Sequence, residues 1–198
     1  MNPVSEPSAP RRIALFGGSF DPVHHGHLIL ARDALEQLQL DLVLFIPAAH
    51  SPHKPDTNPS PGLLRAEMIA AAIEGEQGFA LCPLELSREG PSYSIDTAHA
   101  LRALHPDAEL FFLLGEDNLP LLHTWRRIDE LRATVRFVVY GRGTASRTHD
   151  FPRLQRRLDL SATEIRQRVA RGASIRYLVP DAVQNLIHRH HLYRSTHH

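Results

Sequence analysis

The sequence contains one cysteine among its 198 residues, no long apolar run and no net charge. The single cysteine, Cys82, cannot form an internal disulfide, and its apolar neighbours predict a buried thiol, which fits a reducing cytoplasm. No stretch approaches the roughly 20 apolar residues that a membrane-spanning helix needs. Because the 22 basic and 22 acidic residues balance, neither a nucleic acid nor a membrane surface is indicated as a partner. These absences favour a cytoplasmic protein.

The N-terminal end is rich in proline and serine and lacks the apolar segment of a signal peptide. We expect residues 1–10 to be a disordered tail and residues 11–198 to form one domain, long enough to bury a sizeable core. Histidine is abundant, with 14 residues, and several lie at the C-terminal end, where solvated surface is the expected setting. The composition leaves open whether the chain forms an oligomer.

Short apolar runs alternate along the chain with segments of helical periodicity. Strands are predicted at residues 13–16, 41–47, 79–84, 110–114 and 135–140, and helices at residues 28–38, 63–74, 95–104, 125–131 and 161–172. This alternation predicts an α/β fold, a single domain built on a Rossmann-like, doubly wound parallel sheet with helices on both faces. Ligands of such sheets bind at the carboxyl ends of the strands, which is where the motifs described next lie.

The segment at residues 17–27 directly follows the first predicted strand and reads Gly-Gly-Ser-Phe-Asp-Pro-Val-His-His-Gly-His. Glycines allow a ligand to approach the backbone, and the start of the following helix offers N–H groups and the positive end of a dipole. Together they predict an anion site, for which phosphate is the common occupant. His24 and His27 can each donate a ring N–H to a phosphate oxygen. The segment lacks the glycine spacing of a dinucleotide fingerprint and the ending of a Walker loop.

A second anion site is indicated at residues 161–166, which read Ser-Ala-Thr-Glu-Ile-Arg. Ser161 and Glu164 have the spacing of a capping box, which by itself explains only the start of a helix. Thr163 and Arg166 add a hydroxyl and a guanidinium beside the positive end of that helix, as a phosphate site requires. Taken with the first motif, the segment favours a nucleotide.

Two His-x-x-His pairs leave a tetrahedral zinc site as an alternative: His24 with His27, and His50 with His53. Zinc would not need the glycines around the first pair, and the chain has no cysteine cluster. We therefore favour the anion site and predict no metal held by protein side chains alone.

The Gly-Gly-Ser-Phe-Asp-Pro and His-x-Gly-His elements, with Ser-x-Thr-x-x-Arg at residues 161–166, resemble the two signature motifs of the nucleotidylyltransferase superfamily. Further landmarks are similar to those of bacterial nicotinate-mononucleotide adenylyltransferases, at residues 52–54, 92–97, 115–117, 125, 178–180 and 190–193. Ser94 departs from the threonine that is frequent in the family, and the stretch between Tyr140 and Ser161 is shorter than expected. The resemblance implies adenylyl transfer from ATP to nicotinate mononucleotide, giving deamido-NAD and pyrophosphate in NAD biosynthesis.

The resemblance also implies a role for individual residues. The catalytic set is His24, His27 and Arg166, with both histidines directed to the triphosphate and the reacting phosphorus. The ATP phosphates would be bound by Gly17, Gly18, Ser19, Phe20, Gly26, Lys54, Ser161 and Thr163. The pyridine substrate would be bound by Ser94, Gly115, Asp117 and Trp125, whose flat face suits a pyridine ring. No carboxylate cluster for a metal is evident, so Mg²⁺ is expected to be held mainly by phosphate oxygens.

The sequence also predicts that the acid, nicotinate mononucleotide, is preferred over the amide. Main-chain N–H groups and the Ser94 hydroxyl would pair with both carboxylate oxygens, whereas the NH₂ of the amide would meet mismatched donors. No arginine is evidently dedicated to the carboxylate, so we expect main-chain dipoles to provide the selectivity.

Two alternatives remain open. A sister enzyme would act on nicotinamide mononucleotide or phosphopantetheine, but pantetheine-phosphate adenylyltransferases resemble Thr-x-Gly-His where this chain has His24. A nucleotide-binding regulator would bind without turnover, but the intact His24, Gly26, His27, Thr163 and Arg166 argue against a dead site.

Overall fold

The computed structural model describes residues 11–49, 59–88, 90–141, 150–154, 156 and 158–194. Its centre is a parallel five-stranded sheet with the strand order β3-β2-β1-β4-β5. The strands are β1 Arg12–Gly18, β2 Leu42–Pro47, β3 Phe79–Leu81, β4 Glu109–Gly115 and β5 Arg136–Tyr140. The predicted doubly wound α/β fold is therefore confirmed. Strand β3 is shorter than the predicted run, because Pro83 has no N–H to extend the ladder.

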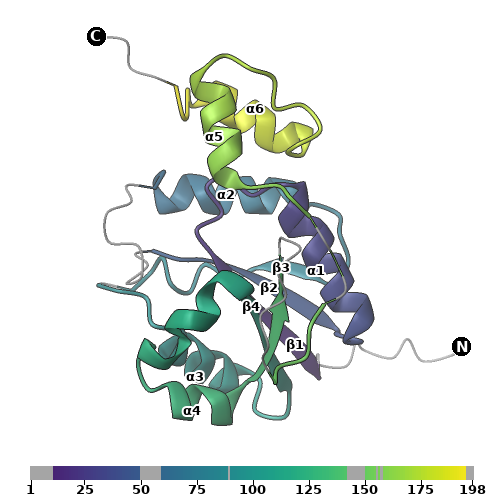
Figure 1. Ribbon diagram of the computed structural model, residues 1–198, viewed down its shortest axis with the longest axis vertical. Helices are drawn as coiled ribbons and strands as arrows, with labels where there is room; N and C mark the ends of the chain where they lie inside the picture. The colour runs from purple at the N-terminus through teal and green to yellow at the C-terminus, as the bar shows by residue number, and fades with distance from the viewer. Residues whose placement is uncertain are drawn as a thin grey trace, which may run out of the picture.

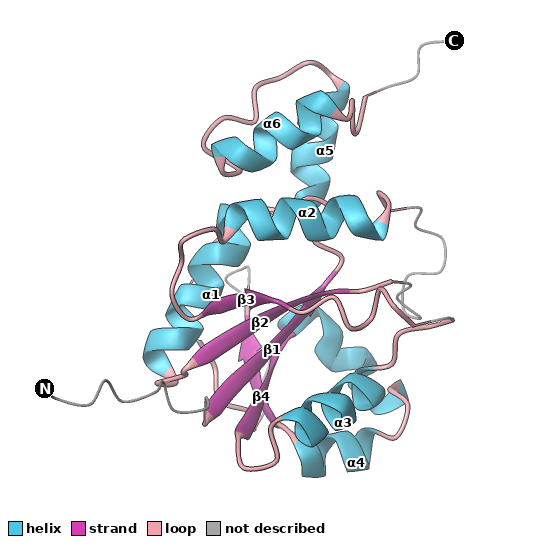
Figure 2. Cartoon of the chain, turned by 180° about the vertical axis from the view of Figure 1, so that it is seen from behind, coloured by secondary structure: helices cyan, strands magenta, loops and turns pink. Residues whose placement is uncertain are grey.

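Helices cover both faces of the sheet (Figures 1 and 2). On one face lie α1 His25–Gln37 and α2 Gly62–Ala72, with α5 Ala162–Ala170 and α6 Asp181–Arg189 beyond α2 (Figure 1). On the other face lie α3 Ser94–Leu104 and α4 Ile128–Thr134. None of the helices in the described part of the chain is long and apolar enough to cross a membrane.

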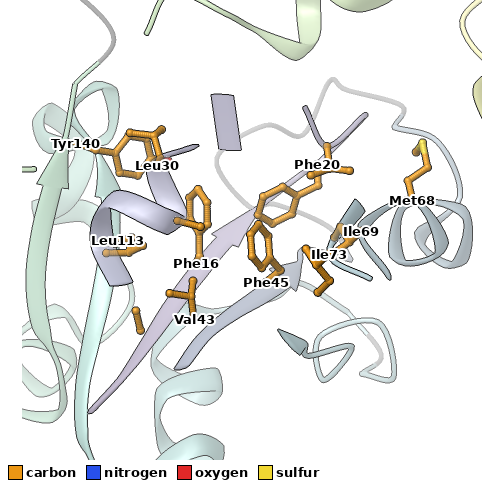
Figure 3. Packing of buried hydrophobic residues seen from close by; sticks show 14 of the residues in the cluster. Phe16, Phe20, Leu30, Val43, Phe45, Met68, Ile69, Ile73, Leu113 and Tyr140 are labelled. Carbon is orange, nitrogen blue, oxygen red and sulfur yellow. The ribbon is translucent and has the colours of Figure 1, made fainter. Parts of the chain in front are cut away.

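The two faces of the sheet bury separate apolar clusters. Ala14 and Phe16 of β1 belong to the cluster under α1 and α2, whereas Ile13 and Leu15 belong to the cluster against α3 and α4. A strand buried on both sides has to be apolar at every position, which is why the strands read as continuous apolar runs. Figure 3 shows Phe16, Phe20 and Phe45 packed together, with ring centroids 5.4 to 5.7 Å apart. These rings support the loop that follows β1.

The structure departs from the predicted elements between β4 and β5. The expected helix over residues 125–131 is replaced by a 3₁₀-helix, η1 Glu116–Thr124, and the short helix α4. Trp125 lies between them, and Arg127 adopts the left-handed conformation (φ 53°) directly before α4. A proline inside η1, Pro120, removes one N–H donor and disfavours a regular α-helix.

Two further details differ from the sequence prediction. Helix α6 is not among the predicted helices, although Val183, Leu186 and Ile187 have helical spacing and are buried. Cys82 is half-buried, not fully buried as predicted, and its partial burial raises the pKa of the thiol.

Candidate functional site

A pocket of about 520 Å³ opens at the carboxyl ends of the central strands. Gly17 and Gly18 at the end of β1 and Gly115 at the end of β4 line it. The chain winds outward from β1 in one direction and from β4 in the other, so the pocket lies at the switch point where open parallel sheets bind ligands. A Cβ at Gly17 would meet no atom within 4 Å, so a ligand can approach this backbone closely.

The two histidines of the first motif form a stacked pair at the start of α1. His24 is the N-cap residue, and its ring lies 3.7 Å from the ring of His27, centroid to centroid. The backbone N–H of His24 donates to Nδ1 of His27 at 3.3 Å. Because Nδ1 accepts, the neutral His27 ring carries its proton on Nε2, which is then available as a donor. His27 lines the pocket, whereas His24 is only 1% exposed and does not line it.

Gly26 leaves room for the ring of His24 and does not line the pocket. A Cβ at this position would lie 3.0 Å from two atoms of the His24 ring, so any side chain would displace the imidazole. One of the expected free donors of the helix start is already used, since the His25 N–H donates to the carbonyl of Leu178 at 3.0 Å. The glycine therefore permits the stacked arrangement, and the C-terminal segment anchors it.

The second motif lines the same pocket, next to the first. Ser161 is the N-cap of α5 and its Oγ accepts the N–H of Glu164 at 3.1 Å, which confirms the predicted cap. The Arg166 guanidinium donates to the carbonyl of Asp21 at 2.8 Å and to the Thr163 hydroxyl at 3.2 Å. Ser161, Thr163 and Arg166 all line the pocket. A side chain of the second motif is thus bonded directly to the backbone of the first.

Asp21 is a site residue that sequence reasoning missed. Its side chain is buried, and its Oδ1 accepts the hydroxyl of Tyr193 at 2.6 Å while its Oδ2 accepts the Ser60 N–H at 3.2 Å. Burial and the Asp21 carboxylate both raise the pKa of Tyr193 far above its ordinary value, so the hydroxyl stays protonated and remains a donor. The loop after β1 is therefore tied to the C-terminal segment.

Arg65 of α2 ties the loop after β1 to both ends of the connection between β2 and α2, and sequence reasoning also missed it. It is 1% exposed, and its guanidinium donates to the carbonyls of Ser60, Ser19 and Ala48 at 2.8, 2.7 and 2.8 Å. Burial lowers the pKa of Arg65 and the nearby Asp21 carboxylate raises it, and an arginine remains charged under such shifts. All three carbonyls belong to residues that line the pocket.

The other end of the pocket is built from the start of α3 and the segment after η1. Ser94 and Trp125 line it as predicted, together with Tyr93 and Arg126. Trp125 packs edge-on against Phe112 of β4, with ring centroids 5.8 Å apart. The indole is therefore both a packing residue and a wall of the pocket.

Glu85 is a buried carboxyl beside this end of the pocket. Its Oε1 accepts the hydroxyl of Thr97 at 2.8 Å, and the Thr97 oxygen also accepts from the Arg88 guanidinium at 3.0 Å. Burial raises the pKa of Glu85, and the hydrogen bond from Thr97 opposes this rise. The carboxyl is thus engaged with a hydroxyl group in the first turn of α3.

The pocket brings together most of the predicted site residues. Those that line it are Gly17, Gly18, Ser19, Phe20, His27, Ser94, Gly115, Asp117, Trp125, Ser161, Thr163 and Arg166. His24 and Gly26 lie against its wall without lining it. Lys54 and the second histidine pair, His50 and His53, lie outside the described residues. The described part of the chain contains no group of three or more His, Cys, Asp or Glu side chains that could hold a metal ion.

Comparison with known proteins gives matches over nearly the whole chain. The Cytidylyltransferase-like family model matches residues 15–168. A protein of Shouchella clausii described as a probable nicotinate-nucleotide adenylyltransferase is 43% identical over 188 residues, which cover 92% of this chain and 97% of that protein. One of Gemmatimonas aurantiaca with the same description is 43% identical and covers 93% of each chain.

A solved structure extends the comparison to the fold. Nicotinic acid mononucleotide adenylyltransferase of Plasmodium falciparum, complexed with NaAD, has a TM-score of 0.78 at 19% sequence identity. The similarity covers 92% of this chain and 97% of that one. At this identity the likeness supports the fold.

Proposed function

Because the chain belongs to the Cytidylyltransferase-like family and, within it, to the nicotinate-nucleotide adenylyltransferases, we propose that its pocket holds ATP beside nicotinate mononucleotide and joins them. The adenylyl group of ATP is transferred to the phosphate of the mononucleotide, which gives deamido-NAD in NAD biosynthesis. A phosphate oxygen attacks the α-phosphorus of ATP, one P–O bond forms, and the bond to pyrophosphate breaks.

The observation that carries this proposal is the bond between the two phosphate motifs. Arg166 donates to the carbonyl of Asp21 at 2.8 Å, although 145 residues separate them. The bond places a guanidinium and the start of α5 beside the loop after β1, at the same pocket. Two adjoining anion sites fit a triphosphate better than a single phosphate.

The chemistry asks the protein for alignment and charge neutralisation. The second pKa of a phosphate monoester is near ~6, so the attacking phosphate is largely ionised at neutral pH and needs no general base. Nε2 of His27 donates to phosphate oxygens of ATP, and Arg166 with the Ser161 and Thr163 hydroxyls neutralises the departing pyrophosphate. We retain His24 as a triphosphate contact, and its ring and main-chain N–H also orient His27.

The remaining predicted residues complete the substrate sites. Gly17, Gly18, Ser19 and Phe20 bring main-chain groups to ATP, Gly26 makes room for the histidine pair, and Lys54 binds the phosphates. Trp125 stacks on the pyridine ring, the Ser94 hydroxyl meets its carboxylate, and Gly115 and Asp117 border the mononucleotide. The described part of the chain offers no side-chain cluster for a metal, so Mg²⁺ enters as MgATP, held mainly by phosphate oxygens.

The proposal assigns the reaction to the cytoplasm, with small molecules as its partners and neither a nucleic acid nor a membrane involved. The free Cys82 and the balanced charge of the chain support this assignment. Assembly into an oligomer is compatible with the proposal and is not required by it.

A substrate panel tests the proposal. Folded protein with MgATP should release pyrophosphate with nicotinate mononucleotide, less with nicotinamide mononucleotide, and none with phosphopantetheine. Release only with phosphopantetheine would assign the chain to the sister enzyme. Nucleotide binding without release from any of the three would indicate a regulator, and either result would overturn the proposal.

A further inference from the structure

The pyridine end of the pocket contains a cationic side chain that no predicted role includes. Arg126 directly follows Trp125 and lines the pocket together with Tyr93 and Ser94. Its guanidinium carbon lies 4.6 Å from the centroid of the Tyr93 ring, over the face of that ring. Arg126 therefore spans the two segments that form this end of the pocket, the residues before α3 and those after η1.

The charge of Arg126 is not balanced by a carboxylate among the described residues. No described Asp or Glu oxygen forms an ion pair with it, whereas the neighbouring Arg127 donates to both Glu130 oxygens at 2.7 Å. Glu85, a carboxyl at this end of the pocket, is buried and bound to the Thr97 hydroxyl. Arg166, the other arginine that lines the pocket, is bonded to Asp21 and Thr163 at the phosphate end.

We propose that Arg126 determines the preference for the acid by placing a permanent positive charge beside the carboxylate of the pyridine substrate. This inference rests on the proposed function and deepens it. A guanidinium stacked on an aromatic face keeps the N–H groups at its edge available, and those groups match two carboxylate oxygens. A carboxamide carries no charge and directs its own NH₂ donors at these N–H groups, so it gains little from Arg126.

Selection by Arg126 differs from the expectation that main-chain dipoles provide the selectivity. The Ser94 hydroxyl and nearby main-chain N–H groups bind either pyridine substituent through part of their hydrogen bonds. Arg126 adds a term that depends on charge, and this term has to weaken as salt increases, because the side chain is exposed.

The test compares kcat/KM for nicotinate mononucleotide and nicotinamide mononucleotide in Arg126→Gln, with Arg127→Gln as the matched control. Arg127 carries the same charge one residue away, is engaged with Glu130 and does not line the pocket. Arg126→Gln should lower the acid-to-amide ratio of kcat/KM about fivefold, the size expected for a partly solvated charge pair. Arg127→Gln should leave the ratio unchanged, and Arg126→Lys should keep part of it.

The dependence of kcat/KM on ionic strength and the binding of the two mononucleotides distinguish the remaining outcomes. Between low and high ionic strength, kcat/KM for the acid should fall more in the wild type than in Arg126→Gln. An equal loss for both substrates would make Arg126 a purely structural clamp on Tyr93, and an unchanged ratio would remove it from recognition; both results overturn the inference. If the wild type turns over neither pyridine, the proposed function has failed, and calorimetric titration with the two mononucleotides then decides the role of Arg126.

Discussion

Backbone contacts orient individual donors of the proposed phosphate site before any ligand binds. The His24 N–H occupies Nδ1 of His27, and the Asp21 carbonyl holds the guanidinium of Arg166. Each contact engages one part of the side chain and leaves another part for the substrate. Donors oriented in advance stabilise a transition state without reorganisation, which is the largest single term in many enzymes.

The role of Nε2 in His27 can be isolated with amide side chains. His27→Ala should lower kcat by roughly 10²–10³, as expected for the loss of one preorganised donor. Gln places its NH₂ near the position of Nε2, whereas Asn places its amide near Nδ1 and keeps only an acceptor for the His24 N–H. His27→Gln should therefore retain more activity than His27→Asn, measured as steady-state kcat for pyrophosphate release. The reverse order would show that the Nδ1 contact, and not the Nε2 donor, is what turnover requires.

Arg166 is expected to act on turnover far more than on folding. Arg166→Met removes the guanidinium but keeps much of the apolar stem, so kcat should fall by roughly 10²–10³. The melting temperature should change by only a few degrees, since one hydrogen bond to the Asp21 carbonyl contributes about 1 kcal/mol. Thermal unfolding and kcat measured on the same preparation check both halves. A large fall in melting temperature with near-normal kcat would make Arg166 a structural residue.

At the scale of elements, α2 and the C-terminal segment hold the loops of the pocket in place. Helix α2 contributes Arg65, and the segment after α6 contributes Tyr193, which reaches Asp21 in the loop after β1. Loops that bind ligands are commonly the least stable parts of a fold. Here hydrogen bonds from the side chains of Arg65 and Tyr193 stabilise the loops.

The contribution of Arg65 can be measured as stability. Arg65→Met should lower the free energy of unfolding by about 3 kcal/mol or more, because three main-chain carbonyls lose a buried charged donor. Arg32→Met is the matched control on α1, since Arg32 pairs with Glu76 at the surface and such pairs contribute less than about 1 kcal/mol. Urea unfolding of both variants checks the difference. Equal losses would mean that the three carbonyls do not depend on Arg65.

The raised pKa of the Tyr193 hydroxyl predicts that the protein loses stability in alkali. Its pKa is raised in the folded state, so folding binds a proton that the unfolded chain releases above about pH 10. The contribution of the Tyr193 hydroxyl to the free energy of unfolding is fully present below that pH and is lost as the pH rises further. In Tyr193→Phe the fall of unfolding free energy above pH 10 should be shallower than in the wild type. Identical slopes in urea unfolding at several alkaline pH values would contradict the assignment.

At the scale of the whole molecule, the position of the pocket follows from the order of the strands in the sheet. The strands β1 and β4 are neighbours, and their carboxyl ends point to the same edge of the sheet, so Gly17 and Gly115 meet across one pocket. Both faces of the sheet are buried, which makes the edge the place where polar groups can gather. The helices on either side then bring the second motif and the start of α3 to that edge.

This dependence on topology explains which features the sequence could predict. Continuous apolar runs and glycine turns are local signals, so the sheet, a helix after the glycine segment and the cap at Ser161 were predicted correctly, although that helix begins at His25 and not at residue 28. The bond from Tyr193 to Asp21 joins residues 172 positions apart, and no local pattern encodes it. Arg65 reads as an ordinary charged residue in a helix, and only its burial reveals its three carbonyl partners.

The measurement that tests the central claim most directly follows the α-phosphorus of ATP. Protein incubated with Mg²⁺, nicotinate mononucleotide and ATP labelled at the α-phosphate should give labelled deamido-NAD and unlabelled pyrophosphate. ATP labelled at the γ-phosphate should give the opposite distribution, with all of the label in pyrophosphate. Label from the α-phosphate recovered as AMP, or label from the γ-phosphate recovered on the mononucleotide, would show hydrolysis or phosphoryl transfer and would contradict the account.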